Sequence, residues 1–210
     1  MAVLPANLLP GASKRMEALS DGVFSIAATL LVLEIKVPNL KSGFTSEDMR
    51  HALKEVFPSF VAFVFSFLNI LIFWVNHDAV GKVVTRYDHK TTYLNVLFLL
   101  LISLIPFTTN FVSEYPGSLI AISVYGIVLL LNAVVACVMY GHLAFGSQLM
   151  LPEVTMASRK KIWKRIIMGP VLFLIAILAG FIHVYIPVII YIITPVSFMV
   201  LPNMDFVFDE

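Results

Sequence analysis

A run of polar side chains interrupts one of the most apolar parts of the sequence. In the stretch SDGVFSIAATLLVLEIKVP, which covers residues 20–38, Ser20, Asp21, Ser25 and Thr29 recur at short intervals. Hydroxyl and carboxylate oxygens in an apolar helix serve two purposes: they join helices by hydrogen bonds, or they replace water around a passing cation. The elements that position these side chains decide between the two.

The composition is that of a membrane protein. The chain has 210 residues, of which 60% are hydrophobic and only 13% charged, and its mean hydropathy is +0.94. A soluble domain is about half apolar and a quarter charged, so the solvent of this chain must be largely lipid. The net charge of +1 gives no indication of a nucleic-acid partner, and the single Cys137 excludes a disulfide framework.

About 20 apolar residues cross a bilayer as a helix, and the sequence contains six such stretches. They are residues 19–36, 57–76, 92–112, 118–145, 166–182 and 184–201. We therefore predict an all-α polytopic membrane protein with one domain, residues 1–210. Only His183 separates the last two spans, which predicts a tight hairpin, and Pro106 and Pro195 should kink or end their helices.

Charges in the loops predict the orientation. Six spans place both termini, the second-to-third loop and the fourth-to-fifth loop on one side of the membrane, and that side carries ten of the fourteen basic residues. The positive-inside rule then predicts cytoplasmic termini in a multi-pass protein of the cell inner (plasma) membrane. The run RKKIWKR at residues 159–165 is read as a topology signal that contacts lipid headgroups; a regulatory or nucleic-acid patch is the alternative.

The first span has a narrow face with a distinct composition. At 100° per residue, Ile26, Leu30 and Leu33 follow one line, and Gly22 and Thr29 lie beside it. Small and polar residues on such a face are typical of close helix packing. The other interpretation is that the face surrounds an axis shared by several subunits, where rings of Ile and Leu narrow a pore. Periodicity alone leaves both open.

Asp21 lies near the cytoplasmic start of the first span, where an acid must be paired or hydrated. It is interpreted either as the N-terminal cap of the helix or as part of a cluster. The second span ends in FWVNHD, which brings Trp74 and His77 to the same side of the membrane, so Arg15, Ser20, Asp21 and His77 are expected to come together. His77 has no partners at metal-ligand spacing, and no metal site is predicted.

Other polar residues bear on rival functions. Glu34 is expected either to concentrate cations at the outer mouth or to pair with Lys36 or another subunit. Four asparagines lie deeper in the spans and are expected to join helices rather than bind substrate: Asn69, Asn95, Asn110 and Asn132. Charges deep in the membrane are nearly absent, which disfavours a secondary transporter. Hydrolase and phosphate-loop motifs are missing, so no enzyme is predicted. A transporter and a non-conducting assembly subunit remain the alternatives.

The sequence resembles a known family. Arg15-x-x-x-Leu19-Ser20-Asp21, followed by GVFSIAATLLVLEIKVP, is similar to the Arg-x-x-x-Phe-Ser-Asp signature of the transmembrane protein 175 potassium channels. The resemblance continues in FWVNHD and in RYDHKTTYLNVLFLLLISLIPFTTNFVSEYP and extends to about residue 120. The sequence departs from the signature at Leu19, where the family has Phe.

The resemblance implies a homotetrameric channel of prokaryotic origin with one six-helix repeat. It implies a potassium-selective cation pore, with modest preference over sodium, that is lined by the first helix and has no TVGYG filter. By that resemblance Ile26, Leu30 and Leu33 form a hydrophobic constriction and Thr29 faces the passing ion. K+ ions are the permeant species, and no cofactor is implied. The signature supports the pore helix through a network with these members: Arg15, Ser20, Asp21, Trp74 and His77.

Overall fold

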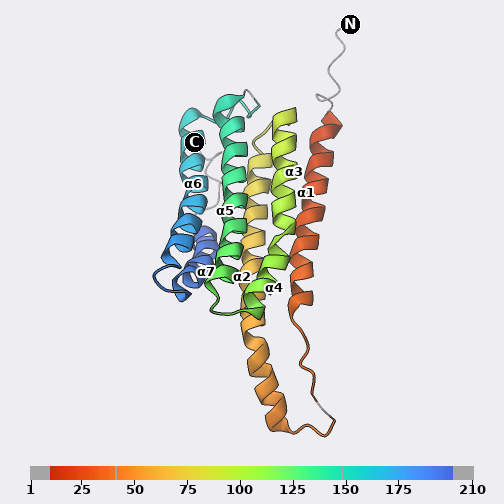
Figure 1. Cartoon of the computed structure of the whole chain (residues 1–210). Helices are drawn as coiled ribbons and strands as arrows, with labels where there is room; N and C mark the ends of the chain where they lie inside the picture. The colour runs from red at the N-terminus through yellow and green to blue at the C-terminus, as the bar shows by residue number, and fades with distance from the viewer. Residues whose placement is uncertain (1–9, 41, 148, 201–210) are drawn as a thin grey trace.

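The chain folds as a bundle of α-helices (Figure 1). The computed structural model describes residues 10–40, 42–147 and 149–200. The helices are α1 (Pro10–Leu30), α2 (Ser46–Gly81), α3 (His89–Ser103), α4 (Ile105–Glu114), α5 (Leu119–Gly141), α6 (Met156–Ala179) and α7 (Tyr185–Val200). Because only Leu104 separates α3 from α4, the described chain has six helical segments, which confirms the predicted all-α fold.

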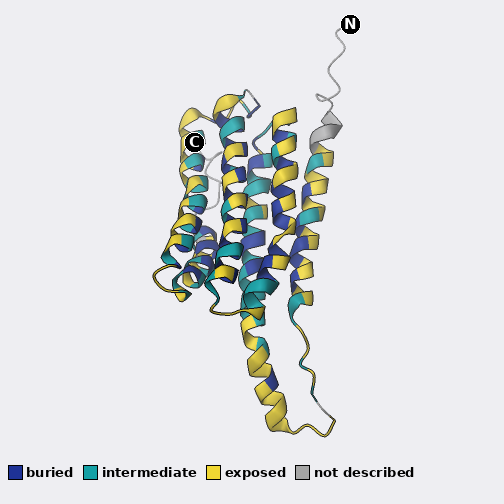
Figure 2. Cartoon of the chain, viewed as in Figure 1, coloured by how far each residue is buried: buried dark blue, intermediate teal, exposed yellow. Residues whose placement is uncertain are grey.

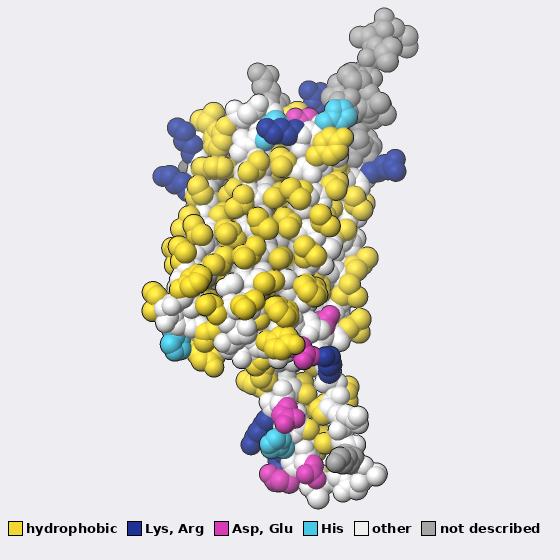
Figure 3. All heavy atoms as spheres, viewed as in Figure 1, with side chains coloured by type: hydrophobic (Ala, Val, Ile, Leu, Met, Phe, Trp, Pro, Cys, Tyr) yellow, Lys and Arg dark blue, Asp and Glu magenta, His cyan; other side chains and the backbone are white. Residues whose placement is uncertain are grey.

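Five helical segments are long and apolar enough to cross a membrane. They are Lys14–Glu34, Ser46–Gly81, His89–Glu114, Leu119–Gly146 and Met156–Ala179, and the apolar helix Tyr185–Met199 is shorter. Figure 3 shows hydrophobic side chains covering the side of the bundle, with charged side chains at its two ends. So much exposed apolar surface is stable only against lipid. Position 201, the expected end of the last span, lies outside the described residues.

The second helix begins well before the predicted residue 57. Thr45 caps it: its hydroxyl accepts from the Asp48 N–H, and the Asp48 carboxylate accepts from the Thr45 N–H. This capping box starts a helix in a polar stretch that hydropathy does not detect. A helix of 36 residues is about 54 Å long, so the N-terminal part of α2 projects beyond the bundle (Figure 1).

Prolines shape two other segments. α3 ends at Ser103, and α4 begins at Ile105 with Pro106 in its first turn. Because proline has no N–H to donate to the preceding turn, the helix breaks there, as predicted for Pro106. Pro195 instead lies inside α7, which continues past it to Val200. The turn between α6 and α7 is short, which confirms the predicted hairpin.

Two distorted turns extend helices. The chain after α1 continues as a 3-10 turn, η2 (Leu31–Glu34), and α5 continues as a π-turn, η3 (His142–Gly146). The loop between α2 and α3 meets the loop between η3 and α6 at an isolated antiparallel bridge between Val84 and Met150. Such changes in winding alter which side chains share a helix face, and in η2 they affect the position of Leu33.

α5 lies at the centre of the packing and makes its closest approach to α6 and α7 at a glycine. A Cβ atom placed on Gly126 would lie 1.9 Å from the Tyr191 hydroxyl and 2.9 Å from Ile177 Cγ1. The Tyr191 ring packs edge-on against Tyr125, with centroids 5.4 Å apart. Gly126 therefore makes room for an aromatic pair that joins α5 to α7.

We predict that Gly126→Ala destabilises the protein by about 1–3 kcal/mol, because the added methyl overlaps a ring that cannot move freely. Gly169→Ala is the matched control: its added carbon would meet only Ala133 Cβ, at 3.6 Å, so alanine's helix propensity should make it neutral or stabilising. Thermal unfolding of the purified variants in detergent measures both. Equal melting temperatures would contradict the prediction.

Candidate functional site

The two faces of α1 differ sharply in burial. Phe24, Ala27 and Leu31 face α2 and α3 and are buried. On the opposite face Ile26 is 59% exposed, Leu30 44% and Leu33 72%. Figure 2 shows that buried and exposed residues alternate along α1. The face predicted from periodicity is therefore free for contact with lipid, another subunit or a pore.

The winding of η2 alters the alignment of this face. In an α-helix Leu33 would lie about 60° away from Leu30 around the axis, because three residues turn about 300°. Leu33 belongs instead to the 3-10 turn Leu31–Glu34. Residues three apart eclipse one another in 3-10 geometry, so Leu33 moves toward the line of Leu30.

The exposed hydroxyls of α1 donate to their own helix. The Ser25 hydroxyl donates to the Asp21 carbonyl at 2.7 Å, and the Thr29 hydroxyl donates to the Ser25 carbonyl at 2.8 Å. Each hydroxyl hydrogen is thus used within the helix, and the oxygen lone pairs stay available on the exposed face. This arrangement suits a cation or a water hydrogen and offers nothing to an anion.

A chain of three side chains, of which Ser20 and Asn95 are buried and His77 is half-buried, joins α1, α2 and α3. Asn95 Nδ2 donates to Ser20 Oγ at 3.0 Å, and Asn95 Oδ1 lies 2.7 Å from His77 Nε2. Because the Asn95 oxygen can only accept, His77 Nε2 carries the hydrogen. The imidazole also stacks on Phe98, with centroids 5.7 Å apart. Asn95 is the centre of this chain.

Asp21 is held separately. Trp74 Nε1 donates to Asp21 Oδ1 at 2.9 Å, on the exposed side of the same helix ends. The structure thus brings Ser20, Asp21, Trp74 and His77 to one place, as two adjacent contacts rather than one cluster. Arg15 is exposed, and within the described residues it makes no hydrogen bond or ion pair. Asp21 bonds α2 and is not the cap of α1, which begins at Pro10.

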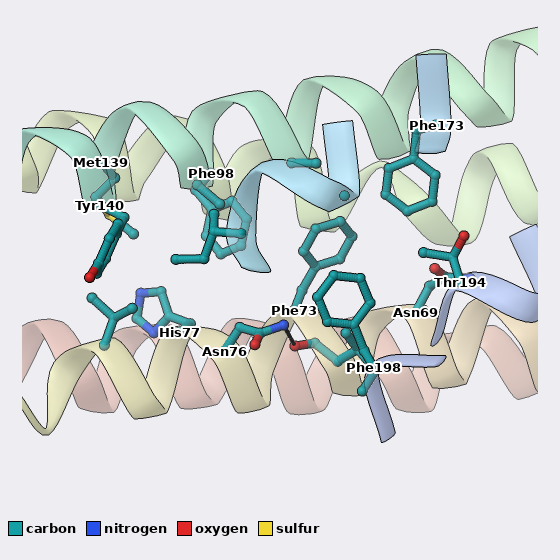
Figure 4. Close-up of a pocket in the computed structure, with 16 residues that line it drawn as sticks. Asn69, Phe73, Asn76, His77, Phe98, Met139, Tyr140, Phe173, Thr194 and Phe198 are labelled. Carbon is teal, nitrogen blue, oxygen red and sulfur yellow. Dashed lines mark hydrogen bonds between the residues drawn. The ribbon is translucent and has the colours of Figure 1, made fainter. Parts of the chain in front are cut away.

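His77 also borders a cavity of about 60 Å³ between α2, α5, α6 and α7 (Figure 4). Most of its lining is apolar, including Phe73 and Tyr140, and Asn69 and Thr194 add polar groups. The volume is that of about two water molecules. Within the described part of the chain no three metal-binding side chains come together. The main feature beside this cavity is the Ser20–Asn95–His77 chain of hydrogen bonds, which joins α1, α2 and α3.

The chain that follows α1, in η2 and just after it, is attached to α4. Asn110 donates a hydrogen bond to the Glu34 carboxylate, and Lys36 pairs with Glu114. The hydrogen bond and charge of Glu114 raise the pKa of Lys36. Glu34 thus bonds an amide on α4, and the expected Glu34–Lys36 pair is replaced by Lys36–Glu114. Both ends of α1 are tied to neighbouring helices.

The asparagines behave largely as expected. Asn69 donates to the Tyr191 carbonyl at 3.2 Å and joins α2 to α7, while Asn95 and Asn110 join α1 and η2 to α3 and α4. Asn132 is the exception: its amide donates only to Val128 of its own helix, and its Oδ1 has no hydrogen-bond partner. Asn95 was missing from the predicted network, although its position in an apolar run marked it as a helix-joining residue.

The start of α3, which carries Asn95, is fixed by an acid. Asp88 caps α3 by accepting from the Thr91 N–H at 2.8 Å, and it contacts His142 Nε2 at 2.7 Å. Partial burial opposes ionisation of the Asp88 carboxyl, but the bonds from Thr91 and His142 outweigh it and lower its pKa to about 2. Asp88 is therefore an anion at neutral pH and ties α3 to the end of α5.

Comparisons with known proteins identify relatives of this arrangement. Residues 15–106 match the family described as endosomal/lysosomal potassium channel TMEM175. A potassium channel of Chamaesiphon minutus is 38% identical over 192 residues, which are 90% of this chain and 94% of that protein. A potassium channel of Streptomyces collinus is 40% identical over 146 residues, which are 68% of this chain and 69% of that protein.

A solved structure shows the same fold. The crystal structure of a lysosomal potassium-selective channel TMEM175 homolog from Chamaesiphon minutus has a TM-score of 0.79 against this chain at 36% identity. The match covers 90% of this chain and 97% of that one. The likeness therefore extends through all six helical segments and is not limited to the signature around residue 20.

We predict that Asn95→Leu destabilises the protein by about 1–2 kcal/mol, because Ser20 and His77 lose their partner in a membrane interior. Asn132→Leu is the control, since Asn132 is equally buried but joins no second helix; we expect it to be neutral or stabilising. Thermal unfolding in detergent measures both. If Asn132→Leu proved the more damaging, Asn95 would not be the junction described here.

Proposed function

The chain belongs to the TMEM175 family, and we propose that it is a potassium channel in which four copies surround a central pore lined by α1. The observation that supports the proposal is the exposed face of α1. Ile26, Leu30 and Leu33 stand on it in line, turned away from the chain's own bundle, with the Thr29 oxygen between them. The Thr29 oxygen keeps its lone pairs on this face because its hydrogen is donated within α1.

The apolar side chains supply the barrier. A potassium ion enters with its water, and stripping that water against Leu and Ile side chains costs far more than thermal energy. Four copies of Leu30 or Ile26 brought close to an axis would exclude water and close the pore. A small widening or rotation of α1 would admit a hydrated or partly hydrated ion. The constriction is thus a hydrophobic gate rather than a binding filter.

Thr29 supplies the polar step between the apolar rings. Because its hydrogen is donated to the Ser25 and Ile26 carbonyls, a ring of four Thr29 side chains would present only acceptor oxygens. Such a ring replaces part of the hydration of a cation and repels anions. Hydroxyl oxygens on flexible chains hold an ion loosely, so we propose a modest preference for potassium over sodium.

The distribution of charged residues supports an assignment of one end of the bundle to the cytoplasm and the other to the outside. Basic side chains gather at the end of the bundle where α2 meets α3 and α5 meets α6 (Figure 3), so we propose that this end is cytoplasmic, with both termini, in the cell inner membrane. Asp21 and its Trp74 bond then lie at the inner mouth. Glu34 lies at the outer mouth, where its charge concentrates cations.

We predict that Leu30→Ala raises K+ flux severalfold, because a ring of four smaller side chains leaves a wider opening from which water is less readily excluded. Leu131→Ala is the control, since Leu131 on α5 has the same 44% exposure as Leu30 and no proposed role in the pore. Liposomes loaded with KCl and diluted into NaCl report K+ efflux through a proton-coupled dye. Unchanged flux in Leu30→Ala, or an equal rise in Leu131→Ala, would show that the gate does not lie on α1.

We predict that Thr29→Val keeps flux but lowers the ratio of K+ to Na+ permeability, because the variant keeps the shape of the side chain and loses the oxygen. Bi-ionic reversal potentials measured in planar bilayers give the ratio. Leu131→Ala, on α5 and without a proposed role in the pore, should leave the ratio unchanged. An unaltered ratio in Thr29→Val would mean that the Thr29 oxygen does not contact the ion.

We predict that the purified channel contains four chains, because one α1 face alone cannot enclose a pore. Native mass spectrometry of the detergent-extracted protein counts the chains. Flux that does not saturate with K+ concentration would separate a channel from a carrier. Folded protein of another stoichiometry, or tetramers without flux in every variant, would favour the transporter or a non-conducting assembly subunit.

A further inference from the structure

A second cavity lies between α2, α4, α5 and α7, and α1 contributes none of its lining residues. Its volume is about 160 Å³, and its walls include Phe65, Val112, Ile122 and Val188. This is close to the size of an apolar cavity that stays free of water and accepts one benzene molecule. The site described above does not use this cavity, which we call the Tyr125 cavity.

The inner end of the Tyr125 cavity carries hydroxyls that already have partners. Thr109 Oγ1 donates to Ser66 Oγ at 2.7 Å, and Ser66 Oγ lies 3.0 Å from the Tyr125 hydroxyl. None of the buried polar side-chain atoms that lack a partner in the described residues belongs to the cavity lining. A water molecule needs two to four polar partners, so nothing here calls for water or a charged ligand.

The mouth of the Tyr125 cavity lies beside the α4–α5 turn. Its exposed lining residues are Pro58, which lies inside α2, and Pro116, Gly117 and Tyr185, which lie in the turn or at the start of α7. Tyr185 reaches over the turn, since a carbon placed on Gly117 would be 3.9 Å from its hydroxyl. Exposed tyrosines at helix ends are typical of the level of lipid headgroups. From Pro58 to Ser66 the cavity extends about 12 Å inward along α2, into the acyl-chain region.

From this geometry we propose that the Tyr125 cavity binds one acyl chain of a membrane lipid from the leaflet that borders the α4–α5 turn. The bilayer supplies this ligand at the depth and with the chemistry that the walls require. A chain that enters gains van der Waals contacts that an empty cavity lacks. Tyr185 and the Gly117 turn leave the lipid headgroup at the surface. The proposal does not depend on ion conduction.

The test is to locate the acyl chain by bromine. Crystals grown from a lipidic phase that contains phosphatidylcholine with mid-chain dibromination should show anomalous density inside the cavity, near Ser66 and Tyr125. Ala62→Phe, which adds a ring to the cavity lining, should abolish that density. Val134→Phe, which adds the same ring on the exposed surface of α5, should leave it unchanged.

Three results would overturn the proposal. They are a wild-type cavity without bromine density in crystals that contain brominated lipid, a cavity filled by ordered water, and a cavity filled by a side chain of a neighbouring subunit. If Ala62→Phe fails to fold, the retention of lipid by the wild-type protein provides a second measurement. Native mass spectrometry of wild-type protein diluted into detergent should find a phospholipid that survives extraction, and a fully lipid-free protein of unchanged melting temperature would also overturn the proposal.

Discussion

A membrane interior offers no water, so burying a polar side chain without a partner in the protein costs free energy. Asn95 meets this requirement for three helices at once: its amide serves Ser20 on α1, and its oxygen serves His77 on α2. Removing Asn95 would take from Ser20 its bond to α3 and leave it only the Met16 carbonyl of its own helix, and His77 would lose the acceptor of its Nε2 hydrogen. The orientation of α1 follows from it, because the helix can bury Ser20 only by turning Ile26 and Leu30 outward.

The same requirement explains why the outward face of α1 carries hydroxyls without penalty. Ser25 and Thr29 satisfy their hydrogens within the helix, so the face needs no partner from the chain's own bundle. A helix that used those hydroxyls to bind α2 or α3 would have no acceptors to offer elsewhere. The buried polar group Ser20 therefore fixes α1 to its neighbours, and the exposed hydroxyls of Ser25 and Thr29 leave their oxygens available.

The positions of the helices and the exposed face of α1, which depend on short stretches of sequence, were largely predicted. Hydropathy located the six segments, and the 3.6-residue period separated Ile26 and Leu30 from the buried Phe24 and Leu31. The start of α2 was misplaced because a capping box, rather than apolar content, begins that helix. Trp74 was expected in the network, but its bond to Asp21 and the bond of Asn95 to His77 could not be predicted, since only tertiary packing selects these contacts. Arg15 shows the converse, because its place in a motif does not supply a partner within one chain.

The tight turn at the outer end of α1 has a consequence for motion. Asn110 holds Glu34 at one end of that turn, while Leu30 ends the α-helix at the other. Between these two fixed points the backbone can exchange three residues per turn for 3.6, a difference of about 20° for each residue. Leu33 would then swing by about 60° around the helix axis with little change in where α1 is attached. A change of winding over the four residues of η2 can thus turn the Leu33 side chain without moving the rest of the bundle.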